Sequence, residues 1–242
     1  MSAGLTPIRR HGGLENVSRA LAVLTALFLA GIVVLVLVDR SSNTSNSRGG
    51  TGSGVAATQA RSVPPFTGVD LAGANNVEVR VGARQAVIVH ADGNLLGRVT
   101  TQVSSGSLVI GKTPGTLNAR SPTFVVVSAP SLDAVTVEGS GNISVTGING
   151  PSFTVQLPGS GNIHAAGTTE RLGVAIGGSG TALLSRLIAR DATASIDGSG
   201  SIVLTATHSL DASISGSGTI FYTGNPAQVT RSVTGSGTIS GE

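Results

Sequence analysis

The chain has 242 residues, including 35 glycines, no cysteine and no tryptophan, and only 11% of its residues are charged. Glycine disfavours helix interiors while Val, Ile and Leu recur throughout, so a helical bundle and a disordered chain are both excluded, as is any disulfide or cysteine nucleophile. The net charge is +3, but four of the 15 basic residues and two of the 12 acidic ones lie before residue 41, so the nearly neutral remainder predicts no nucleic-acid partner.

Residues 20–38 form an uninterrupted apolar stretch with a single polar side chain. At about 1.5 Å per residue, a helix of this length nearly spans a hydrocarbon core of about 30 Å. Arg9, Arg10 and Arg19 precede the stretch, so the positive-inside rule places residues 1–19 in the cytoplasm. The sequence therefore predicts a single-pass protein of the cell membrane, anchored through 20–38, with its C-terminal part outside the cytoplasm.

Two alternatives for this stretch are a cleaved signal peptide and a buried core helix. A signal peptide has an apolar core of about 7–15 residues followed by an A-x-A-like site, which VLVLVDRSSN does not provide. The polar run that follows argues against a core helix. Residues 39–62 are rich in Ser, Gly, Thr and Asn, which is typical of a flexible tether, and the folded domain is predicted over 63–242.

The tripeptide Gly-Ser-Gly recurs six times at intervals of 18 to 20 residues, which indicates a repeat architecture. Two columns of mostly β-branched or aliphatic residues accompany it, and polar residues alternate with them. The first column, two residues before each triplet, holds Val137, Leu157, Ile176, Ile196, Ile214 and Val233. The second, four residues after the first glycine, holds Ile143, Ile163, Ala182, Ile202, Ile220 and Ile239.

Alternation with period two predicts strands that bury one face. The parity continues through each triplet, so both glycines are predicted to point inward at a crowded bend. The serine between them is expected to face outward or to hydrogen-bond to its neighbours in adjacent repeats. A repeat of about 19 residues favours one coil of a parallel β-helix, whereas a propeller blade needs about 40. A β-sandwich remains the alternative, because antiparallel strands also alternate.

Residues 66–242 resemble a bacterial family of unknown function, the putative auto-transporter adhesin head domain, also called the GIN domain. The resemblance lies in Val77 to Gly111, with its Asp-Gly-Asn-Leu-Leu and Gly-Ser-Leu-Val-Ile segments, and in Phe124 to Ile143, where a proline and a leucine precede the first triplet. It implies a right-handed β-helix displayed at the cell envelope. It implies no catalytic or ligand residues.

Several motifs have a structural interpretation as well as a chemical one. Gly106 to Thr113 matches the P-loop pattern, but its central residues are typical of a strand and a Pro-Gly follows, so no nucleotide is expected. The four histidines lack metal-ligand spacing and are interpreted as surface or turn residues: His11, His90, His164 and His208. Glu138 and Asp197 share the position before a triplet with uncharged residues of other repeats, so no calcium ladder is expected. Asp133, Asp191 and Asp211 lie one per coil near strand starts and are interpreted as turn residues.

The sequence thus predicts no catalytic, cofactor-binding or metal-ligating residue. Phe221 and Tyr222 are the adjacent aromatic pair of the repeat region, and one of them is expected in the core. The predicted function is a membrane-anchored extracytoplasmic module for surface interaction, adhesion or scaffolding, and not an enzyme. Its expected partners are an envelope protein or a second copy of the chain. The alternative is an envelope enzyme that acts on polysaccharide.

Overall fold

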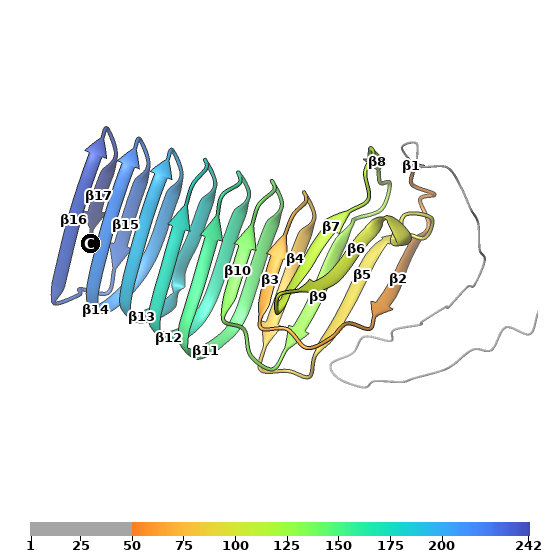
Figure 1. The fold of residues 1–242 in the computed structure, drawn as a ribbon, viewed down its shortest axis with the longest axis horizontal. Helices are drawn as coiled ribbons and strands as arrows, with labels where there is room; N and C mark the ends of the chain where they lie inside the picture. The colour runs from red at the N-terminus through yellow and green to blue at the C-terminus, as the bar shows by residue number, and fades with distance from the viewer. Residues whose placement is uncertain (1–49) are drawn as a thin grey trace, which may run out of the picture. The chain divides into compact units, whose positions relative to one another are not determined.

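The computed structural model describes residues 50–242, and the transmembrane prediction for 20–38 lies outside the described residues. Within 50–242 no helix has the length and apolar character needed to cross a bilayer. This part of the chain is all-β and forms a β-solenoid of about five turns with almost no helix (Figure 1).

The N-terminal part of the fold is less regular than the repeats. Its elements are β1 (Gly50–Thr51), β2 (Ala56–Arg61), β3 (Gly68–Leu71), β4 (Asn76–Val81), β5 (Ala86–Asp92), the 3₁₀ helix η1 (Leu96–Arg98), β6 (Val99–Ser104), β7 (Ser107–Lys112), β8 (Leu117–Asn118) and β9 (Phe124–Ala129). The repeats follow as β10 (Ala134–Val137), β11 (Asn142–Leu157), β12 (Asn162–Ile176), β13 (Thr181–Gly198), β14 (Ser201–Gly216), β15 (Thr219–Thr223), β16 (Gln228–Gly235) and β17 (Thr238–Gly241).

The repeats form two flat faces joined at two corners. Strands β11 to β14 each run along one face, round a corner and back along the other (Figure 1). Face A comprises residues 142–145, 162–165, 181–184, 201–204, 219–222 and 238–241, whereas face B comprises 152–157, 171–176, 191–196, 209–214 and 228–233. All these pairings between coils are parallel, which excludes the sandwich alternative.

The two faces enclose one continuous apolar core. Both predicted columns point into it, and their members are at most 3% exposed from Val137 to Ile220. The exceptions belong to the last coil, where Val233 is 44% exposed and Ile239 is half-buried. Tyr222 also points inward, as expected for one member of the aromatic pair, and the guanidinium of Arg231 covers its ring at 5.2 Å.

The Gly-Ser-Gly triplets lie at the first corner, which we call the triplet corner. Each serine of the triplets is exposed and the second glycines are buried as far as Gly218, as predicted. The first glycines are only half-buried, and Gly235 in the last coil is exposed. The coils approach so closely here that a Cβ on Gly161 would overlap the carbonyl oxygen of Gly141 and lie 2.8 Å from Val137 Cγ1. Backbone hydrogen bonds continue through the corner, as from Thr181 N to Gly161 O at 3.1 Å. Glycine is therefore required by space and not only by flexibility.

The N-terminal part departs from the predicted parallel helix. Antiparallel pairing joins β2 to β5, β5 to β9 and β6 to β7, and no triplet occurs here to set a parallel corner. The predicted tether 39–62 is also wrong in its second half, because β1 and β2 lie within it. Strand β2 is ordered because it pairs with the otherwise free edge of β5. The polar composition of this segment does not indicate such a pairing.

Asp92 explains how this N-terminal segment is held. Its side chain is fully buried and accepts hydrogen bonds from the backbone nitrogens of Gly54 (2.8 Å), Arg120 (2.8 Å) and Ser121 (3.2 Å), and from Ser121 Oγ (2.9 Å). Burial raises the pKa of Asp92, but these hydrogen bonds outweigh it, so the net pKa lies below its ordinary value. The ionised carboxylate thus joins two separate chain segments to β5.

We expect Gly161→Ala to destabilise the full chain by about 1–3 kcal/mol, because its new methyl group must displace backbone of the preceding coil. Gly173→Ala is the matched control, since a Cβ there meets only Thr154 Oγ1 at 3.9 Å and should change stability by less than about 1 kcal/mol. Urea unfolding of both variants measures the difference. Equal stabilities would contradict close packing at the triplet corner.

We expect Asp92→Asn to lower the melting temperature at pH 7, because an amide oxygen cannot replace a carboxylate that accepts four hydrogen bonds. The folded-state pKa of Asp92 is depressed, so its stabilisation is present above the unfolded pKa of about 3.9 and is lost as the pH falls through the folded pKa. The melting temperatures of wild type and variant should therefore converge below about pH 4. A difference that is constant from pH 7 to pH 3 would show that the carboxylate charge is irrelevant.

Candidate functional site

A shallow groove of about 220 Å³ crosses face B beside the second corner. Its floor is the backbone around the buried residues Leu172, Ala192 and Leu210, and its walls are two columns of outward side chains. Four successive coils contribute to the walls, because the parallel register aligns their side chains. One column holds Arg171, Asp191, Ser209 and Gln228; the other holds Thr193, Asp211 and Thr230.

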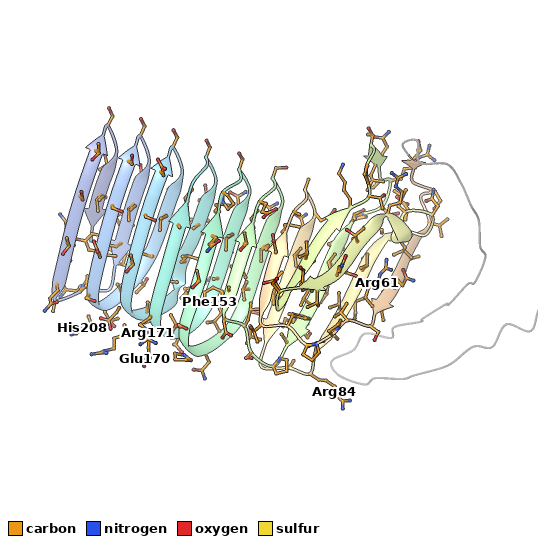
Figure 2. The ribbon with its side chains drawn as sticks, viewed as in Figure 1. Arg61, Arg84, Phe153, Glu170, Arg171 and His208 are labelled. Carbon is orange, nitrogen blue, oxygen red and sulfur yellow. The ribbon has the colours of Figure 1, made fainter. Side chains whose placement is uncertain are left out.

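Asp191 is the centre of the polar contacts in this groove. Its Oδ1 atom accepts hydrogen bonds from Ser209 Oγ at 2.6 Å and from His208 Nδ1 at 2.7 Å, and its Oδ2 atom lies 3.4 Å from Arg190 Nη1. The hydrogen bonds from Ser209 and His208 lower the pKa of Asp191, so the carboxylate is ionised at neutral pH. Figure 2 shows His208 and Arg171 projecting at this corner.

The same cluster does not have the order needed for nucleophilic catalysis. A serine nucleophile requires a histidine between it and the carboxylate, so that the imidazole can take the hydroxyl proton. Here Ser209 and His208 both contact the same Asp191 oxygen, in parallel rather than in series. Across residues 50–242, no three His, Asp or Glu side chains are grouped to hold a metal ion. The groove instead offers both donors and acceptors, which suits binding of a polar surface.

The sequence interpretation of Asp191 and Asp211 missed this grouping. Each of the two residues lies thirteen positions after the first glycine of the preceding triplet, which suggests that they align with each other. In the structure, however, Asp191 aligns with Ser209, and Asp211 aligns with Thr193. The coil lengths differ, and register shifts at the second corner absorb the difference before face B begins. Counting back from the following triplet gives the observed alignment, since Asp191 lies seven positions before Gly198 and Asp211 five before Gly216.

The remaining motifs mostly follow their structural interpretations. The P-loop-like segment is strand β7, with Leu108 and Ile110 buried, and it pairs with β6 rather than starting a helix. His164 is exposed on face A. His90 corrects the prediction of a surface or turn residue, because it is half-buried in β5 and stacks on Phe124 at 4.3 Å. Burial lowers the pKa of His90, against an opposing effect of Glu78.

The acidic residues other than Asp191 and Asp211 lie apart from the groove. Asp133 precedes β10 and is exposed, and Glu138 and Asp197 are exposed beside the triplet corner. Glu138 and Asp197 do not form a column of carboxylates. The equivalent positions of the two coils between them hold a proline and a glycine. His11 lies outside the described residues.

These features define a class of protein: a β-solenoid with two faces, in which side chains from successive coils together form a surface groove. The chain belongs to the family described as putative auto-transporter adhesin, head GIN domain, whose model matches residues 65–226, about two thirds of the chain. The resemblance found in the sequence is thereby confirmed.

Solved structures with the same fold support this assignment at the level of architecture. A putative adhesin from Bacteroides fragilis is 21% identical, with a TM-score of 0.66 over 79% of this chain and 99% of its own. A putative adhesin from Parabacteroides merdae is 18% identical, with a TM-score of 0.51 over 80% and 99%. A putative lipid binding protein from Parabacteroides distasonis is 24% identical, with a TM-score of 0.50 over 80% and 99%. No curated protein sequence matches the chain.

Proposed function

We propose that the protein is a non-enzymatic adhesion or scaffold module whose β-solenoid binds an envelope component through the groove on face B. The observation that carries this proposal is the alignment of polar side chains from four coils along one groove. The backbone ladder fixes the positions from which these side chains project, so binding them requires no ordering of the backbone. Membership of a family described as a putative adhesin head supports the same conclusion.

The proposal places the solenoid outside the cytoplasm, anchored by a transmembrane helix over residues 20–38. Its support is the sequence alone: nineteen uncharged residues, all but one of them apolar, follow Arg9, Arg10 and Arg19, the arrangement that keeps an N-terminus in the cytoplasm. The right-handed coiling implied by the family resemblance belongs to this proposal as well. A polysaccharide-cleaving enzyme has no comparable support, because glycoside hydrolysis needs a carboxyl group with a raised pKa as its proton donor, and the pKa of Asp191 in the groove is lowered.

The anchoring part of the proposal predicts that protease added to intact spheroplasts degrades residues 50–242 of the full chain. A tag placed before residue 20 should survive on a small fragment, because the cytoplasm shields it. Disrupting the membrane should then expose the tag. Protection of the solenoid in intact spheroplasts would reverse the orientation, and a mature N-terminus beyond residue 38 would show cleavage.

The groove predicts a second result, measured as binding of purified envelope fragments to liposomes that carry the full chain. Replacing Arg171 and Asp211 together by alanine should weaken binding by about tenfold or more, because central interface residues contribute about 1–3 kcal/mol each. A matched control replaces Thr154 and Gln156, which are exposed on face B outside the groove. Equal loss in both variants, or none in either, would place the binding site elsewhere.

A further inference from the structure

The outward side of face A carries a short apolar stripe on an otherwise polar surface. Its central column begins with the polar residues Ser144 and His164 and continues with Leu183, Val203 and Phe221 on consecutive coils. Leu183 is 37% exposed, and the other two apolar side chains are half-buried. These residues alternate with the inward ones of the same strands, so their side chains point away from the core.

The columns beside the stripe carry no charge on β14 and β15, whereas on β13 the exposed Arg186, aligned with Ala166, ends the column on the side away from the triplets. Thr181, Ser201 and Thr219 form the column on the triplet side. On the other side, Thr205 Oγ1 and Thr223 Oγ1 lie 2.9 Å apart and satisfy each other. Face B of these coils is different, because Asp191, Asp197 and Asp211 project from it or from its end.

We propose that face A of β13, β14 and β15 is a self-association surface, occupied by the same face of a second copy of this chain. A two-fold contact brings each residue of the patch against the same patch, so like charges repel wherever the patch is charged. Face A of β14 and β15 avoids this repulsion, whereas face B would bring its carboxylates together. Two copies also share the same coil rise, so their ridges of Leu, Val and Phe interdigitate along the whole stripe.

The size of the surface determines how strong the contact is. Three strands at about 4.8 Å, each with about five residues at 3.3 Å, give a footprint of ~240 Å² per copy, under a third of the ~800 Å² typical of a stable interface. The pair is therefore weak and reversible in dilute solution. Anchoring in one membrane would raise the local concentration and favour it; this point and the liposome experiment below rest on the proposed membrane anchor.

The middle coil of the stripe places Val203 close to the two-fold axis. The chain contains no cysteine, so any covalent dimer of a single-cysteine variant is linked at the introduced position. We expect Val203→Cys in the full chain, reconstituted in liposomes, to give a covalent dimer with a short thiol-to-thiol cross-linker at least tenfold faster than Ser195→Cys, because packed sheets lie about 10 Å apart and a direct disulfide would not reach. Ser195 is the matched control, being equally half-buried but on face B.

A second substitution shows whether the stripe itself causes the contact. Adding Phe221→Glu to Val203→Cys should reduce dimer formation to the control rate, and Thr193→Glu on face B should not. Leu183→Ser removes apolar surface without adding charge and should also slow dimer formation, which guards against a folding effect of Phe221→Glu. Equal rates for Val203→Cys and Ser195→Cys, or dimer formation insensitive to both stripe substitutions, overturns the proposal. Binding of envelope fragments is a separate measurement, so its failure leaves this result unaffected.

Discussion

Close contact between glycines of successive coils is the constraint on which the rest of the structure depends. At the triplet corner, each first glycine from Gly159 onward lies against the backbone of the equivalent glycine in the preceding coil, where no Cβ fits. This contact fixes the register of neighbouring coils at one point. The alternating residues on both sides then follow, so that aliphatic columns meet in the core and polar columns face solvent. A shift of one residue in the pairing of two coils would turn the aliphatic columns to solvent and the polar columns into the core.

The second corner is where the repeats differ from one another. Coils of 18 to 20 residues share the same triplet corner, so the extra residues must be accommodated opposite it. Register shifts occur there between Val145 and Ile148 and between Leu184 and Ile188. Charged and histidine side chains gather beside the same corner, where Figure 2 shows Glu170, Arg171 and His208. Variation is thus confined to one edge, and the groove of the candidate site lies beside it.

The sequence was informative wherever the repeat was regular. The two aliphatic columns, the inward glycines and the outward serines could all be predicted, because period-two alternation and a constant spacing indicate the same face at each position. The N-terminal part lacks this repetition, so its antiparallel pairings and the burial of Asp92 depend on contacts between residues far apart in the chain. The groove was missed for a related reason. Asp191 and Asp211 share an offset from the preceding triplet, but face B is aligned by the following one.

The two proposed surfaces have different functions. The polar groove on face B is proposed to bind an envelope component, and the apolar stripe on face A is proposed to bind a second copy of the chain. Both depend on coils that stack in register over the whole repeat. Spin labels on Ser144→Cys and Ser240→Cys, diluted with unlabelled protein, test this stacking directly, because five parallel steps separate the two positions on face A. Five steps predict a single narrow distance near ~24 Å between backbones. A broad distribution, or a distance that does not correspond to five coils, would contradict the account.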